Sequence, residues 1–221
     1  MVDSRGDADR FRAFAAVLFF LSDAYLNAPR ADVIVALQSG SFLEYWPFDR
    51  THSDVADGLE RLGRFCADWS PDRMAFLEDD HTRLFIGVGR TLAPPYESVY
   101  LSEEHILFEK ETLAVRKWYR KYGLQVPQLH VLPDDHIGYE LFFLARLSER
   151  VVSLLESAET EAAIAVRTDM RRFVDDHPFR WVHMFVDRVL KHCQTDFYAA
   201  TGLLTRFVVE QCRRDAAHTT F

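Results

Sequence analysis

Three side chains within one short segment could act together in chemistry: Asp135, His136 and Glu140. If this segment is helical, His136 and Glu140 lie one turn apart on one face. A histidine and a carboxylate at that spacing could bind a metal ion, and Asp135 could complete an acid–base site. One alternative is therefore a small helical metal-dependent hydrolase. We favour a structural interpretation, in which Asp134 and Asp135 stabilise a helix start while His136 and Glu140 pair, because such local pairs are common.

Other catalytic signatures are missing from the sequence. It has no GxxxxGK[ST] phosphate loop, no HExxH zinc motif and no GxSxG nucleophile turn. Gly87-Val88-Gly89 is a lone GxG with no strand before it, which is a very weak sign of dinucleotide binding. His177, His183 and His192 are six and nine residues apart with Pro178 between them, so they do not share one helical face. We interpret these histidines as core or surface residues.

The cysteines and the N-terminal segment indicate a compartment. Cys66, Cys193 and Cys212 are widely separated and form no metal-binding pair, which is typical of a reducing environment. Residues 13–21 are apolar, but the segment before them balances its acidic and basic residues, so it lacks the positive start of an export signal. The apolar run is also too short to span a membrane. We expect a cytoplasmic protein without an anchor.

Helical periodicity dominates the chain. Val55, Leu59, Leu62, Cys66 and Trp69 recur at the spacing of one helical face. No window alternates with the period of a β-strand, and no internal repeat is visible. Segments 41–50, 87–95 and 124–133 are expected to be irregular. The expected helices cover residues 9–26, 31–38, 54–69, about 71–85, about 101–122, 134–155, 159–174, 179–193 and 195–212.

These patterns predict an all-α fold: a single multi-helix, bundle-like domain spanning residues 1–221, with about eight to ten helices. Residues 124–133 are a candidate hinge, and residues 213–221 are a candidate tail. The 48% of hydrophobic and 14% of aromatic residues exclude intrinsic disorder. A formal charge of −8 excludes a general nucleic-acid binder, which needs a basic surface.

The acidic excess is concentrated in two windows. Residues 96–111 and 131–140 together hold eight acidic residues against one lysine, a net charge of −7. Tyr96 and Tyr100 stand beside the loop at the start of the first window. If the fold brings the windows together, they predict an acidic, aromatic-lined surface for a basic peptide with apolar residues, because carboxylates bind guanidinium groups in bidentate fashion. The alternative is that both windows are solvated helix faces.

The same two windows resemble a known family. Thr82-Arg83-Leu84-Phe85 followed by residues 93–100 (APPYESVY) is similar to the aromatic-x-Ser-x-aromatic signature of the TorD/DmsD/NarJ redox-enzyme maturation chaperones. Residues 133–141 (PDDHIGYEL) resemble the second hallmark of that family, a Glu-Pro-x-Asp-His segment that opens a helix. Leu132 stands where many members have the glutamate before proline, so no role of that glutamate is carried over.

The resemblance, strongest to the TorD/DmsD branch, implies an all-helical, cofactor-free cytoplasmic chaperone that is not an enzyme. Such a chaperone binds the twin-arginine signal peptide and the precursor of a molybdopterin oxidoreductase of the DMSO/TMAO-reductase type, and holds it until molybdenum cofactor insertion, before export. A nitrate-reductase-like client is a further alternative within the family. The protein is expected to be a monomer or a homodimer.

The resemblance also implies a set of peptide-binding residues. Aromatic rings and proline would line a groove for the apolar part of the signal, and carboxylates would meet its arginines. His136 could add pH sensitivity near neutrality. The residues carried over are Tyr96, Ser98, Tyr100, Pro133, Asp135, His136 and Glu140.

Overall fold

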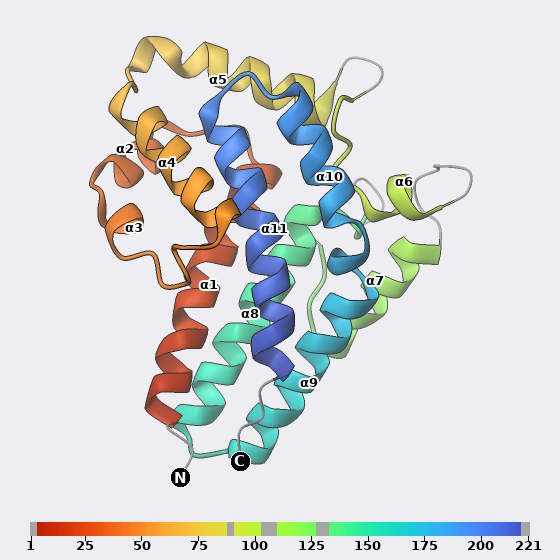
Figure 1. Ribbon diagram of the computed structural model, residues 1–221. Helices are drawn as coiled ribbons and strands as arrows, with labels where there is room; N and C mark the ends of the chain where they lie inside the picture. The colour runs from red at the N-terminus through yellow and green to blue at the C-terminus, as the bar shows by residue number, and fades with distance from the viewer. Residues whose placement is uncertain (1–3, 88–90, 103–109, 127–132, 218–221) are drawn as a thin grey trace. The chain divides into compact units, whose positions relative to one another are not determined.

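The computed structural model describes residues 4–87, 91–102, 110–126 and 133–217, and in these ranges the chain is all-α (Figure 1). A short 3-10 helix (Pro71–Arg73) precedes α5, and a π-helical turn (Thr82–Ile86) follows it. The described part of the chain contains no β-strand. The α-helices are α1 (Ser4–Leu26), α2 (Ala31–Gln38), α3 (Ser41–Glu44), α4 (Ser53–Ala67), α5 (Met74–His81), α6 (Glu97–Leu101), α7 (Lys110–Lys121), α8 (Ile137–Glu156), α9 (Thr160–Asp176), α10 (Pro178–His192) and α11 (Asp196–Ala217).

The predicted fold class is confirmed, and the expected long helices occur where the periodicity places them. Within the expected helix 101–122, Ser102 is extended and residues 103–109 lie outside the described residues. Two short helices are additions. α3 was expected to be irregular, but Gly40 adopts a left-handed φ of 81° and its carbonyl accepts the N–H of Glu44 at 2.8 Å. α6 begins four residues before the expected restart near Leu101. Within the described residues, no helix combines the length and apolar character needed to cross a membrane.

The expected tail is wrong for residues 213–217, which continue α11. Asp215 is buried and accepts hydrogen bonds from the guanidinium of Arg10, including one from Nε at 2.7 Å, so the last turn is fixed to α1. Of the candidate hinge, residues 127–132 lie outside the described residues.

The chain divides into two compact units, and the division falls inside α1, α10 and α11. One unit comprises residues 1–23, 96–182 and 208–221, and the other comprises residues 24–95 and 183–207. That these units form a single domain stays a prediction.

The first unit is built around α8, which buries thirteen of its twenty residues. α9 packs along α8, and the rings of Phe143 and Phe173 meet edge to face at 4.7 Å. Tyr119 of α7 adds a third ring, 5.0 Å from Phe143. From α1, the hydroxyl of Ser22 donates to the carbonyl of Gly138 at 2.8 Å. These contacts hold the start of α8 and all of α7 in place, and the candidate site lies on both.

The second unit packs α4 by the face that the periodicity predicted, with Val55, Leu59, Leu62 and Cys66 buried. Its most deeply buried carboxylate is Asp80, which is fully shielded from solvent. The Asp80 carboxylate accepts the backbone N–H groups of Gln194 and Thr195 at the start of α11 and also the hydroxyl of Thr195 at 2.7 Å. Asp80 thereby satisfies two backbone N–H groups that directly precede α11, and its negative charge is favourable near a helix N-terminus.

Candidate functional site

The two motif segments meet in space. Tyr96 and His136 form an isolated antiparallel bridge, and their rings contact edge to face at 5.1 Å. The N–H of Glu97 donates to the carbonyl of Asp135 at 3.0 Å, and the N–H of Ser98 donates to the Asp135 carboxylate at 2.9 Å. We call residues 96–98 and 134–136 the motif junction. The expectation that the two acidic windows come together is thereby confirmed.

One face of α7 holds the motif junction from the side. The hydroxyl of Thr112 donates to Oδ1 of Asp135 at 2.7 Å. Arg116 donates to Oδ2 of Asp134 from Nη2 at 2.6 Å and from Nε at 3.0 Å, and the hydroxyl of Tyr119 donates to the Asp134 carbonyl at 3.0 Å. The three α7 residues are four and three positions apart, so they share one helical face.

The carboxylates of the junction are not an exposed docking surface, so that part of the prediction is wrong. Glu97, Asp134, Asp135 and Glu140 are all at most 1% exposed. Asp134 neutralises Arg116, and Asp135 accepts the hydrogen bonds described above, because a buried carboxylate must be paired or hydrogen-bonded. The remaining acidic residues of the first window, up to Glu109, lie outside the described residues.

The imidazole of His136 caps α8. Its Nδ1 accepts the N–H of Gly138 at 3.0 Å, so the hydrogen-bonded cap of this helix is His136, and Asp134 and Asp135 precede the cap. Among the described residues, no group of three or more histidine, cysteine or acidic side chains is arranged to hold a metal ion. The hydrolase alternative built on Asp135, His136 and Glu140 is therefore not supported.

The remaining predicted site residues divide by exposure. Pro133 and Ser98 are buried, whereas Tyr96 and Tyr100 are half-buried. The Tyr100 ring stacks on Trp181 with the ring centres 5.3 Å apart. Of the predicted set, the two tyrosines thus present the larger accessible surface. Leu132 lies outside the described residues.

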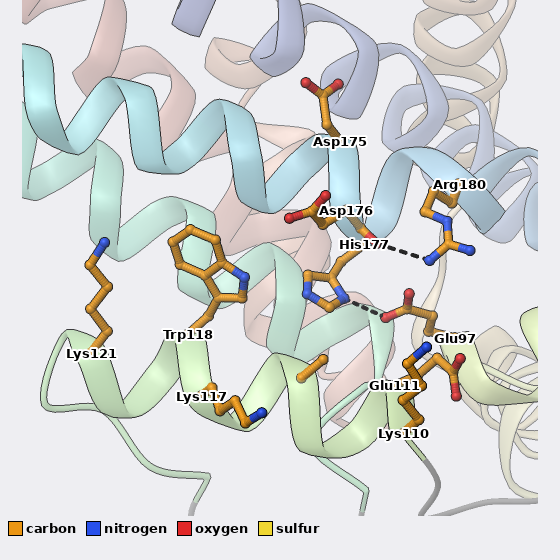
Figure 2. A pocket seen from close by; sticks show the side chains of 11 residues that line it. Glu97, Lys110, Glu111, Lys117, Trp118, Lys121, Asp175, Asp176, His177 and Arg180 are labelled. Atoms are coloured by element: carbon orange, nitrogen blue, oxygen red, sulfur yellow. Dashed lines mark hydrogen bonds and ion pairs between the residues drawn. The ribbon is translucent and has the colours of Figure 1, made fainter.

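A cleft of about 850 Å³ opens beside the motif junction, between α7 and the end of α9 (Figure 2). At its floor, the Nδ1 of His177 and an oxygen of Glu97 are 2.9 Å apart. Trp118 is half-buried and forms an aromatic wall, and its ring meets Phe173 edge to face at 6.0 Å. The lining residues are Glu97, Lys110, Glu111, Ala114, Lys117, Trp118, Lys121, Asp175, Asp176, His177 and Arg180.

The cleft carries both signs of charge. Lys121 pairs with Asp169, and Arg213 pairs with Asp175. Other charged side chains of the cleft have no ion-pair partner among the described residues: Lys110, Lys117, Arg180, Glu111 and Asp176. The cleft can therefore bind a chain segment that presents charged groups next to an apolar or aromatic side chain.

Two residues of this cleft were not predicted as functional. His177 was interpreted as a core or surface histidine; it is a core residue, and its ring is bonded to Glu97, 80 residues away in sequence. Trp118 lines the cleft with its half-buried ring. No local motif marks His177, and its one sequence signal is its place before Pro178, where two helices join.

Glu140 lies on the first turn of α8, and its side chain interacts with Glu97. Burial, followed by the neighbouring charges of Glu97 and Asp135, raises the pKa of Glu140 well above its usual value. Burial also raises the pKa of Glu97, although the hydrogen bond to His177 counteracts this. The two carboxyl groups and His177 thus form a buried group of ionisable side chains.

Comparison with known proteins decides the family. The nitrate reductase delta subunit model matches residues 49–187, which include both motif segments and the cleft residues up to Arg180. The chain belongs to the nitrate reductase delta subunit family. The predicted relationship to the redox-enzyme maturation chaperones is confirmed by the relatives that follow.

Relatives of similar sequence carry chaperone names. The chain is 29% identical over 200 residues to the Tat proofreading chaperone DmsD of Salmonella typhimurium. The aligned region covers 90% of this chain and 85% of that protein. It is 30% identical over 138 residues to the chaperone protein TorD of Aliivibrio fischeri, covering 62% of this chain and 63% of that protein. A candidate redox enzyme maturation protein from Archaeoglobus fulgidus, of known crystal structure, superposes with a TM-score of 0.49 at 21% identity over 91% of this chain and 93% of that one.

Proposed function

We propose that this chain is a cytoplasmic assembly chaperone that binds the twin-arginine signal peptide and the precursor of a molybdopterin oxidoreductase of the DMSO/TMAO-reductase type. It holds the precursor until the molybdenum cofactor is inserted, before export. The observation that carries this proposal is the similarity, over 90% of the chain, to a protein named Tat proofreading chaperone DmsD. No catalytic step is assigned to the chain, and it acts as a monomer or a homodimer.

We further propose that the predicted peptide-binding residues divide into two roles. Tyr96 and Tyr100 contact the peptide with their accessible ring surface. Pro133, Ser98, Asp135, His136 and Glu140 are buried and act by building the junction that presents those rings.

The cleft beside the junction supplies the remaining contacts in this proposal. Trp118 offers an aromatic face to the apolar part of the signal, and Glu111 and Asp176 offer carboxylates to its arginines. Lys117 and Arg180 line the same cleft, so we expect the bound stretch to include acidic side chains of the precursor as well. We therefore expect the cleft to contact a longer stretch of the precursor than its arginine pair.

Binding of a synthetic twin-arginine signal peptide tests the proposal. The matched control is the same peptide with both arginines replaced by lysine, because lysine keeps the charge but loses the bidentate geometry. We expect the arginine peptide to bind more tightly, and its affinity to fall as salt rises. Absence of binding, or equal affinity for the two peptides, would count against the proposed function.

A further inference from the structure

Glu140 is an acidic side chain in an interior that offers it almost nothing to neutralise a charge. It is fully shielded from solvent on the first turn of α8. The indole N–H of Trp181 faces it, but neither carboxyl oxygen of Glu140 accepts a hydrogen bond of ordinary geometry among the described residues. An ionised carboxylate in such a place is very costly unless it is paired.

The titratable groups that act on Glu140 come from α6, from α7 and from the turn before α8. Glu97 of α6 and Asp135 of the preceding turn are acidic, and the hydroxyl of Tyr119 approaches from α7. The nearby basic side chains contact other carboxylates. Arg116 is bonded to Asp134, and His177 is bonded to Glu97, which also feels the charge of the exposed Arg180 guanidinium.

The two carboxyl oxygens of Glu97 differ in their hydrogen-bond partners. Oε2 is 2.9 Å from Nδ1 of His177, whereas Oε1 is buried and has no hydrogen-bond donor among the described residues. Glu97 and Glu140 face each other side chain to side chain. Two buried carboxyl groups in contact share one proton, because both cannot be ionised at once.

We propose that Glu140 is protonated at neutral pH and donates a hydrogen bond to Oε1 of Glu97, while the Nδ1–H of His177 donates a hydrogen bond to Oε2. Glu140 and His177 are then positioning residues: through Glu97 they fix the first turn of α6 against the start of α8. We call this arrangement the proton clasp. Its effect on peptide affinity rests on the proposed function, since Glu97 lies between the accessible tyrosine Tyr96 and Ser98 of the junction.

The proton clasp predicts how the stability of the fold depends on pH. The folded chain keeps the Glu140 proton, whereas the unfolded chain releases it at the ordinary pKa of a glutamate. The contribution of Glu140 to the free energy of unfolding is therefore complete at low pH, and it falls as pH rises toward the pKa of Glu140 in the folded chain. One proton corresponds to a tenfold change in the folding equilibrium constant for each pH unit.

Urea unfolding of the full chain at pH 6 and pH 7 tests the clasp. Glu140→Gln carries an N–H in place of the shared proton and needs no proton uptake. Relative to the wild type, we expect this variant to gain about tenfold in folding equilibrium constant between pH 6 and pH 7. The control is Glu149→Gln, on the exposed side of the same helix, whose pH dependence should parallel the wild type. A Glu140→Gln profile parallel to the wild type would overturn the proposal.

A second measurement keeps the proposal testable if Glu140→Gln does not fold. Infrared spectroscopy of the wild-type chain at pH 7, with carbon-13 in the glutamate side chains, distinguishes a protonated carboxyl from a carboxylate. We expect an isotope-shifted carboxylic acid band at a pH where ordinary glutamates are ionised. Absence of that band would also overturn the proposal.

A peptide-binding experiment tests the proton clasp and the proposed function separately. His177→Asn keeps an N–H near the position of Nδ1, whereas His177→Phe removes the donor. We expect His177→Phe to bind the twin-arginine peptide about tenfold more weakly and His177→Asn to restore the affinity, because a buried hydrogen bond of this kind is worth about that factor. Equal affinity in both variants would contradict the positioning role. If the wild type binds no peptide, the proposed function fails, while the unfolding experiment still decides the proton.

Discussion

The main-chain N–H of Ser98 donates to the carboxylate of Asp135 at 2.9 Å, across 37 residues of sequence. The hydroxyl of Thr112 donates to the other oxygen of the same carboxylate at 2.7 Å. One side chain therefore ties α6 and α7 to the start of α8. This contact turns two separate sequence motifs into one structural feature.

Asp135→Ala should destabilise the fold. The substitution leaves two buried donors unsatisfied, at a cost of at least about 2 kcal/mol in the free energy of unfolding. Urea denaturation measures this cost. Asp79→Ala, an exposed aspartate of α5, is the control and should change little. Unchanged stability of Asp135→Ala together with lost peptide binding would instead mean that Asp135 touches the peptide.

Trp118→Ala should weaken binding of the twin-arginine peptide about tenfold, because a half-buried aromatic wall is removed from the cleft. The comparison is with Leu113→Ala, since Leu113 is 54% exposed on the same helix and does not line the cleft. Isothermal titration calorimetry gives both affinities, and circular dichroism checks that each variant is folded. Equal affinity for the two variants would place the peptide elsewhere.

His81 should reduce the stability of the fold in mild acid. Burial lowers its pKa, although a backbone hydrogen bond to Tyr25 and the charge of Asp80 counteract this. The folded state therefore disfavours the charged imidazole. The stability linked to His81 is complete above about pH 6.5 and is lost as pH falls through the lowered folded-state value.

His81→Asn should make the loss of stability between pH 6.5 and pH 5 smaller, by up to about 1.4 kcal/mol per pH unit. Unfolding free energies of variant and wild type at matched pH values isolate this effect from that of Glu140, which has the opposite sign. The exposed His183, changed to asparagine, is the control. A His81→Asn profile that parallels the wild type would show that the folded chain binds this proton as readily as the unfolded chain does.

The single-domain prediction can be tested by unfolding as well. Three helices pass from one compact unit to the other along the chain, so we expect both units to unfold in one cooperative transition. Trp118 lies in the first unit and Trp69 in the second. Variants that keep one of these two tryptophans as the only fluorescent probe, with the other three tryptophans of the chain replaced by phenylalanine, should give coincident urea midpoints. Midpoints that clearly differ would indicate two domains.

The sequence predicted more of the fold than of the site. Helical periodicity placed the long helices because an amphipathic face is a local property of the chain, as at Val55 and Leu59. It missed α3 and α6, because helices of a few residues have too little pattern to be recognised. The charge pattern wrongly predicted that the junction carboxylates are exposed. The sequence shows the charge of Asp134 and Asp135 but not the distant residues that bury them.

By itself, the sequence determined the all-helical class, the positions of the long helices and the two motifs that mark the family. Each of these depends on residues that are near one another along the chain. Only the tertiary structure decided which residues the motifs contact: Asp135 with Ser98, Asp134 with Arg116, and Glu97 with His177. Burial and pairing depend on neighbours that are distant in sequence, and those neighbours turn an apparent acidic surface into the interior of the candidate site.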